Sequence, residues 1–407
     1  MKQVIIRPAQ RNGSIAPFHV MALLERAQAL EVLGCDVIHL EVGEPDFATP
    51  TAIMDAGQQA LAAGCTRYSP AAGLPLLREK IAAWYQQQFG VTLSAQRIIV
   101  TPGASGALQL ALAALVNPGD GVLVTDPGYP CNRHFLELVN GQAQRLTLSS
   151  QNGMCVSAEQ IDAHWQSNTV AALLASPDNP TGTVLTLAQM EAIAEAVAAH
   201  DGMLIMDEIY QGFCYDHPPH SVLQVAPQAL VVNSFSKFFG MTGWRLGWLV
   251  APEELVPAIE RMAQNFFLAA PTMSQHAALA AFESSTLDEL EQRRQALAAR
   301  RAYLLSALPT LGFEVVGQPD GAFYLYLDVS AITSDSYEWC LRLLEEKYVA
   351  LTPGKDFGAE HGPHRYVRLA YTADVDRLRE AVGRIAAFIQ SDPSSDVDAY
   401  FNKKSSE

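Results

Sequence analysis

The sequence lacks the features that mark several large classes of protein. It has 27 lysines and arginines against 43 aspartates and glutamates, a net charge of -16, and no basic patch typical of nucleic-acid binding. Its six cysteines are scattered without Cys-x-x-Cys or metal-finger spacing. The start has no apolar signal core, and no stretch reaches the ~20 apolar residues of a membrane span. We therefore expect a cytoplasmic protein that binds neither nucleic acid, nor a membrane, nor a metal.

The remaining composition favours a large globular enzyme. The chain has 407 residues, of which 49% are hydrophobic and 17% charged, enough for two or three packed domains. Continuous apolar strands that alternate with alanine-rich helices indicate an α/β fold, with a mostly parallel sheet covered on both faces. The β-rich runs are residues 97–101, 121–126, 170–175, 203–208, 229–234 and 245–251.

The pattern changes after about residue 275. A long helical segment, Ser274–Leu308, precedes two short strands, a helix and a final strand at 365–371, which predicts a smaller α+β domain. We expect the N-terminal segment to pack with it. The predicted division is a large domain at 46–285, a small domain formed by 1–45 and 286–390, and a flexible tail at 391–407.

Polar residues follow several predicted strands, where α/β sheets place their functional sites. Ala104 and Ser105 begin a helix directly after a strand, which creates either an anion site or an ordinary turn. No GxGxxG dinucleotide fingerprint is present. Tyr129 follows a Pro-Gly turn and could stack on a planar ligand, although alone it is more simply a structural tyrosine. Asn179 is displayed by a loop that two prolines and a glycine fix.

Further along the chain, charged residues stand at or near strand ends. Asp207 ends an apolar strand, with Tyr210 three residues on, and a buried carboxylate there needs a cation or a donor unless it caps a helix. Lys237 lies between Ser236 and two phenylalanines just past a strand; it either extends to the surface or, partly desolvated, forms a Schiff base. Arg245 is a candidate phosphate ligand.

Arg368 stands at the centre of an apolar strand and demands an anionic partner. Together these segments closely resemble the class I/II aminotransferases, which are fold-type I enzymes dependent on pyridoxal 5'-phosphate (PLP). The resemblance extends from LEVGEPDF (40–47) to YVRLAYT (366–372). It implies transfer of an amino group between an L-amino acid and a 2-oxo acid.

The resemblance also implies a role for each residue. Lys237 resembles the lysine that holds PLP as a Schiff base and then moves a proton between the substrate α-carbon and the cofactor C4'. Asp207 resembles the partner of the pyridinium N–H, which keeps the ring an electron sink. Asn179 and Tyr210 resemble the donors to the cofactor O3', and Tyr129 resembles the ring stacked on the pyridine.

The remaining ligands follow in the same way. Arg368 resembles the bidentate ligand of the substrate α-carboxylate, helped by Asn179 and the backbone of Gly43. Tyr68 resembles a tyrosine that reaches the cofactor phosphate of a neighbouring subunit, which implies a homodimer. The residues that resemble the phosphate ligands are Ala104, Ser105, Ser234, Ser236 and Arg245.

Two alternatives share parts of this pattern. A PLP-dependent C–S lyase, which performs β-elimination, has the same asparagine, aspartate, lysine and arginine. The ligand-sensing domain of a transcription regulator would need a DNA-binding module and a basic surface. The sequence leaves the amino donor open: residues 15–18 and Tyr324 are expected to line a pocket for apolar or aromatic side chains. No second arginine for a side-chain carboxylate is found.

Overall fold

The structure, a computed structural model, describes residues 7–15 and 17–391. Its largest element is a seven-stranded sheet with the order β2-β8-β7-β6-β5-β3-β4. Within this sheet, β8 runs antiparallel to both of its neighbours, β2 and β7. All six predicted strands are present. The strands are β2 (Ile98–Thr101), β3 (Gly121–Asp126), β4 (Gln142–Thr147), β5 (Thr169–Ala175), β6 (Met203–Asp207), β7 (Leu230–Ser234) and β8 (Gly247–Val250).

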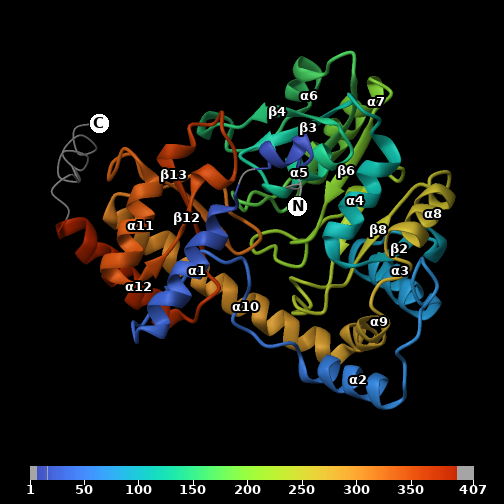
Figure 1. The fold of residues 1–407 in the computed structure, drawn as a ribbon, viewed down its shortest axis with the longest axis horizontal. Coiled ribbons are helices and arrows are strands. Elements are labelled where there is room, and N and C mark those ends of the chain that lie inside the picture. Colours follow the sequence, from blue (N-terminus) through green and yellow to red (C-terminus); the bar gives the residue numbers. More distant parts are fainter. Residues whose placement is uncertain (1–6, 16, 392–407) are drawn as a thin grey trace, which may run out of the picture.

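Helices cover both faces of this sheet, as Figure 1 shows. On one face, Val122 and Val232 pack against α4 (Gly103–Leu115) and α8 (Val256–Phe266). On the other, Leu123 and Val231 join a cluster with α3 (Pro75–Phe89) and α7 (Leu187–Ala199). Strands buried on both sides explain why the sequence shows continuous apolar runs. Three further helices pack around the large sheet: α2 (Thr51–Ala62), α5 (Cys131–Leu138) and α6 (Ala158–His164).

A smaller antiparallel sheet lies beside the large one. Its order is β12-β13-β10-β9, and Trp339 and Phe388 belong to its own hydrophobic cluster. The N-terminal segment packs here, because β1 (Ile38–His39) pairs with β11 (Val349–Ala350). The domain boundaries stay a prediction. The other elements are α1 (His19–Val32), β9 (Glu314–Val315), β10 (Tyr324–Asp328), α11 (Ser336–Lys347), β12 (Thr352–Pro353), β13 (Tyr366–Ala370) and α12 (Val375–Ser391).

The helix predicted over Ser274–Leu308 is interrupted, so the prediction of one continuous helix is wrong. The structure has α9 (Thr272–Ala278), a 3-10 turn and α10 (Ser284–Ala307), with Glu283 extended between them. The second of these helices, α10, contributes to two cores. On α10, Leu290 packs in the large cluster and Leu297 in the small one. Residues 392–407, most of the predicted tail, lie outside the described residues.

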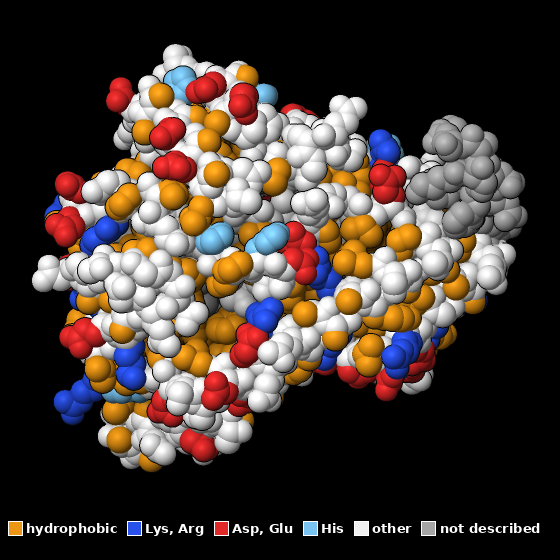
Figure 2. Space-filling view, turned by 180° about the vertical axis from the view of Figure 1, so that it is seen from behind, with side chains coloured by type: hydrophobic (Ala, Val, Ile, Leu, Met, Phe, Trp, Pro, Cys, Tyr) orange, Lys and Arg blue, Asp and Glu red, His pale blue; other side chains and the backbone are white. Residues whose placement is uncertain are grey.

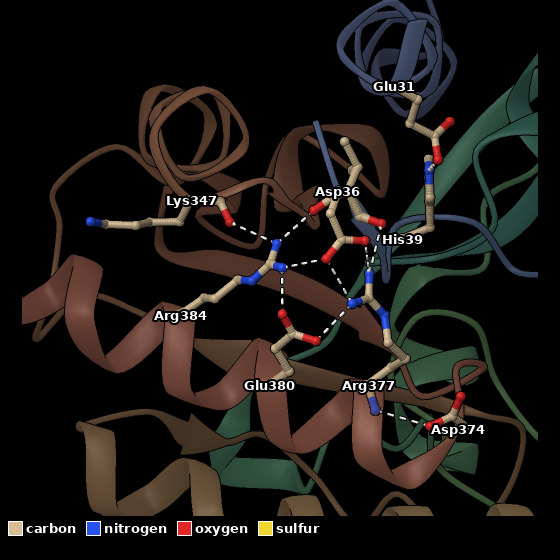
Figure 3. A network of polar contacts seen from close by, with 9 residues as sticks. Glu31, Asp36, His39, Lys347, Asp374, Arg377, Glu380 and Arg384 are labelled. Carbon is tan, nitrogen blue, oxygen red and sulfur yellow. Dashed lines mark hydrogen bonds and ion pairs between the residues drawn. The ribbon is translucent and has the colours of Figure 1, made fainter. Parts of the chain in front are cut away.

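A network of ion pairs ties the N-terminal segment to α12 (Figure 3). Asp36, which precedes β1, accepts hydrogen bonds from Arg377 at 2.7 Å and from Arg384 at 2.5 Å. Glu380, one turn away on the same helix, pairs with both arginines. The two arginines lower the pKa of Asp36 to about 2. The network therefore holds together segments that lie more than 300 positions apart in the sequence.

The surface agrees with the acidic composition. Figure 2 shows small groups of acidic and basic side chains scattered between hydrophobic ones, with no continuous basic area on the described part of that face. No helix among the described residues is long and apolar enough to cross a membrane.

Candidate active site

A cavity at the carboxyl edge of the large sheet brings together most of the predicted site residues. Parallel strands end at this edge, and the loops that follow them carry polar side chains into one space. Four of the lining residues, Leu108, Ala175, Ile209 and Thr242, are not predicted from the sequence. The lining consists of Ala104, Ser105, Leu108, Tyr129, Ala175, Asn179, Asp207, Ile209, Tyr210, Ser236, Lys237, Thr242 and Arg245.

Lys237 presents a reactive amine to this cavity. Its Nζ donates a hydrogen bond to the Gly43 carbonyl at 2.7 Å, so the N-terminal segment reaches the site. Burial is the main cause that lowers the pKa of Lys237 to about 8; Arg368 and Arg245 add to the fall, while Glu44 and Asp207 oppose it. An amine with this pKa is partly neutral near physiological pH. Neutral amines attack carbonyl carbons, which is the chemistry a Schiff base requires.

Asp207 is a buried carboxylate with little compensation. It is 6% exposed, and its Oδ1 accepts a hydrogen bond from the Ile209 N–H at 3.0 Å. Burial raises the pKa of Asp207 to about 7; the Ile209 N–H opposes the rise, nearby Asp178 adds to it, and Lys237 opposes it. Such a group gains most when a positively charged donor binds beside it.

Arg368 extends from β13 toward the same space. It is 4% exposed; its Nη1 donates to Asn179 Oδ1 at 3.0 Å and its Nη2 donates to the Glu41 carbonyl at 2.6 Å. Its Nε is buried and has no hydrogen-bond partner among the described residues. A buried guanidinium that bonds amide oxygens and leaves one N–H unused is suited to an anionic ligand.

The start of α4 and Arg245 form an anion cradle. Gly103 has φ of +71°, and a Cβ on it would lie 2.6 Å from Arg245 Nη2, so glycine lets the guanidinium approach the helix N-terminus. Arg245 Nη1 donates to the Thr242 carbonyl at 3.0 Å. Free N–H groups of Ala104 and Ser105 add positive potential. The Thr242 hydroxyl also donates to the Ser236 carbonyl at 3.2 Å, which fixes this turn.

Four predicted site residues lie outside the cavity lining. Ser234 donates to the Leu246 carbonyl at 2.9 Å and accepts from the Ser236 N–H at 3.0 Å, so it supports Ser236. Gly43 and Arg368 contact the lining residues Lys237 and Asn179. Tyr68 is 82% exposed, and its role in a neighbouring subunit stays a prediction.

The expected side-chain pocket needs a correction. Tyr324 is only 1% exposed, and its hydroxyl lies 2.7 Å from the Tyr210 hydroxyl rather than in an open pocket. Residues 15–18 include one position, residue 16, outside the described residues.

Comparison with known proteins identifies the family. The class I and II aminotransferase family matches residues 35–385. The chain belongs to this family. The aminotransferase is 36% identical over 387 residues to valine--pyruvate aminotransferase of Mycobacterium tuberculosis, covering 95% of this chain and 99% of that protein. It is 34% identical to aspartate/prephenate aminotransferase of Thermus thermophilus, over 93% of this chain and 97% of that one.

The fold comparison agrees. The crystal structure of an aminotransferase from Mycobacterium tuberculosis matches with a TM-score of 0.92 and 36% identity, covering 95% of this chain and 100% of that one. The predicted family, the fold-type I architecture and amino-group transfer between amino acids and 2-oxo acids are therefore confirmed. The roles of individual residues stay predictions.

Proposed function

We propose that this aminotransferase binds PLP covalently through Lys237 and exchanges the amino group of an L-amino acid with a 2-oxo acid. The observation that carries the proposal is the setting of Lys237, whose amine has a pKa lowered to about 8 in a cavity that also contains buried Asp207. The anion cradle at Arg245 lies on the same cavity. An amine, a carboxylate and an anion site match the aldehyde, ring nitrogen and phosphate of PLP.

The donor set fits each part of the cofactor. Arg245, Ser236 and the N–H groups at Ala104 and Ser105 would hold the phosphate. Asp207 would hold the ring N–H, and Asn179 and Tyr210 would donate to O3', with Tyr129 against the ring face. When bound, PLP supplies an aldehyde that takes up the amino group and a ring that accepts the electron pair released at the substrate α-carbon.

The side chains then divide the remaining work. Arg368 holds the substrate carboxylate through a charge-assisted fork, and this orients the α-hydrogen toward Lys237. Lys237 would accept the substrate α-proton and return it at C4', which requires the neutral amine; burial, which lowers the pKa of Lys237 to about 8 in the protein alone, favours that form. Ionised Asp207 keeps its partner nitrogen protonated, and this stabilises negative charge as it develops.

The assembly and location are part of the proposal. Exposed Tyr68 would reach the phosphate of a second subunit, so the active unit would be a homodimer. Its location would be the cytoplasm. The large domain would comprise 46–285 and the small domain 1–45 with 286–390. The packing of β1 against β11 and the separate cluster around Trp339 support this division.

Borohydride reduction of the holoenzyme followed by peptide mapping tests the proposal. The pyridoxyl label should appear on Lys237, and a label on any other lysine would overturn the mechanism. A panel of amino donors, with 2-oxoglutarate and pyruvate as acceptors, then defines the substrates. Release of ammonia and pyruvate from S-alkylcysteines, without transfer to any oxo acid, would favour β-elimination instead.

A further inference from the structure

Two buried tyrosine hydroxyls meet behind the cavity. Tyr210 lines the cavity, whereas Tyr324 lies on β10 of the smaller sheet and is fully buried. Their hydroxyl oxygens are 2.7 Å apart, and either could be the donor. This hydrogen bond connects the large sheet's site to the strand pair that carries Arg368.

The direction of this bond follows from proton counting. A phenol has one proton, so it can donate only one hydrogen bond while accepting others. If Tyr210 donates into the cavity, its contact with Tyr324 must use the Tyr324 proton. Successive hydrogen bonds polarise one another, so donation by Tyr324 makes Tyr210 the stronger donor.

Arg368 lies over the same tyrosine. Its guanidinium carbon is 4.3 Å from the centroid of the Tyr324 ring. In the antiparallel register Arg368 faces Tyr326, which places Tyr324 diagonally across on the same side of the sheet. A cation above the ring draws electron density from it and strengthens its O–H as a donor. The charge on Arg368 thus acts on the Tyr324–Tyr210 bond.

Gly43 leaves room for this arrangement. A Cβ at Gly43 would lie 2.0 Å from the Tyr324 hydroxyl oxygen, so any side chain there must displace the hydroxyl. The carbonyl of Gly43 also accepts the hydrogen bond from Lys237 Nζ. Gly43 therefore accepts a hydrogen bond from the Lys237 amine and, because it has no side chain, leaves space for the Tyr324 hydroxyl.

We propose that Tyr324 is a positioning residue that donates its proton to Tyr210, aims the Tyr210 proton at the cofactor's phenolic oxygen, and couples that oxygen to the charge on Arg368. This inference rests on the proposed PLP function. A carboxylate bound to Arg368 would offset the positive charge above the Tyr324 ring. The Tyr324 hydroxyl would then be a weaker hydrogen-bond donor, and so in turn would the Tyr210 hydroxyl. The substrate would then raise the basicity of the lysine-bound nitrogen, which favours transfer of a proton from the substrate ammonium group to that nitrogen and leaves the substrate amine neutral.

The pH titration of the holoenzyme's visible absorbance measures this coupling. A hydrogen bond donated to the cofactor's phenolic oxygen withdraws electron density from that oxygen. The oxygen then stabilises the proton on the Lys237 nitrogen less. Tyr324→Phe should therefore move the spectral transition to higher pH, by about half a unit or more. Tyr371→Phe is the matched control, because Tyr371 is also fully buried and its hydroxyl donates to the Ala322 carbonyl at 3.3 Å. It should leave the transition unchanged.

A double-mutant cycle isolates the contact. In a Tyr210→Phe background, adding Tyr324→Phe should cause no further shift, because the bond to Tyr210 is already gone. Isobutyrate, a carboxylate without an amino group, should raise the transition pH more in the wild type than in Tyr324→Phe. Equal shifts with isobutyrate would overturn the coupling to Arg368.

The outcomes separate this inference from the proposed function. A wild-type protein with no visible band and no label on Lys237 would overturn the proposed function. A labelled holoenzyme whose transition is unmoved by Tyr324→Phe, even with lower thermal stability, would leave the function intact and overturn the inference. If Tyr324→Phe yields no folded protein, Gly43→Ala must displace the hydroxyl and should give the same upward shift; an unchanged transition there also overturns it.

Discussion

The two halves of the site hold their buried charges differently. In the cavity at the sheet edge, Asp207 accepts one backbone hydrogen bond at 3.0 Å and has a pKa raised to about 7. In the half built on the smaller sheet, Arg368 already donates hydrogen bonds to the Asn179 side-chain oxygen and to the Glu41 backbone carbonyl, and it lies against the ring of Tyr324. The cavity half therefore holds a carboxylate with little support from the protein, whereas in the carboxylate half two neutral oxygens already position the guanidinium and leave its charge and its Nε for an anionic ligand.

This difference predicts where substitutions act. Residues of the cavity half should affect the chemical step and the response to cofactor, because in the proposed function PLP completes their environment. Residues of the carboxylate half should affect binding of amino and oxo acids while leaving the cofactor in place. Substitutions in each half test that separation, beginning with the largest expected effect.

Lys237→Ala should lower turnover by about 10²–10⁴ or more, because the covalent anchor and the proton-transferring amine are both removed. PLP should still bind, without a covalent link, through the phosphate cradle. Borohydride labelling and cofactor content measure the two effects separately. Lys355→Ala is the control, since Lys355 is exposed and stacks near Tyr337. Retained labelling in Lys237→Ala would contradict the assignment.

Asp207→Asn should lower kcat by about 10²–10³ with little change in KM. The carboxylate stabilises charge that develops in the transition state rather than the bound substrate. Steady-state kinetics with saturating PLP provides the measurement. A change confined to KM would withdraw the role given to Asp207.

The same variant should stabilise the cofactor-free protein. Between the ordinary pKa of 3.8 and the folded value of about 7, folded Asp207 retains a proton that the unfolded chain has released. The free energy of unfolding therefore falls as pH rises through this window. At pH 8, apo Asp207→Asn should be more stable than the wild type, by on the order of 4 kcal/mol, and near pH 4 the two should be nearly alike. Urea denaturation at both pH values, without PLP, checks the sign; a difference that does not grow with pH would contradict it.

Arg368→Lys should weaken binding of all amino acids and oxo acids alike, by roughly 1.5–3 kcal/mol for each charge-assisted hydrogen bond that the lysine fails to make. Simple amines that lack the α-carboxylate should be little affected, and PLP content should stay normal. Half-transamination rates for an amino acid and its decarboxylated amine, in both proteins, give the comparison. An unchanged ratio, with lower thermal stability, would mean that Arg368 is structural.

The two halves also differ in how far the sequence predicts them. Asp207 ends one apolar strand and Lys237 lies just past the next, so local pattern and topology predict that they meet. The partners of Arg368 do not follow from local pattern, because Glu41 lies 327 positions away. The sequence places Tyr324 in the substrate pocket. Its actual contact, the Tyr210 hydroxyl, could not be predicted because the two residues lie far apart in the sequence. Thr242 lies in the family-like segment GMTGWRLGW (240–248), but no local pattern assigns a role to its hydroxyl.

The fold shows the same limits. Apolar runs reveal the strands that are buried on both faces, whereas they do not reveal β4. β4 is an edge strand, QAQRLT, in which only Gln144 and Leu146 are buried. The break between α9 and α10 is hard to see in the sequence because both sides have helical composition, and Ala277 and Leu290 on its two sides belong to the same hydrophobic cluster. The helix α12 is not predicted, although Leu378 and Ile385 bury one side of it.

The smallest effect concerns the ion-pair network that holds the carboxylate half together. Asp36→Ala removes the acceptor shared by Arg377 and Arg384, but the Asp36 side chain is 62% exposed and water replaces much of each contact. The melting temperature should fall by about 1 °C or less, and less still in high salt. Asp376→Ala is the control, because Asp376 lies on α12 with Arg377 and Arg384 but pairs with Arg379 nearby in the sequence and is 85% exposed.

KM should be unchanged in both variants, since Arg368 keeps its hydrogen bonds to the Asn179 side chain and the Glu41 carbonyl. A raised KM in Asp36→Ala alone, with normal PLP content, would show that the network positions Arg368 and that the carboxylate half is less self-sufficient than its contacts indicate.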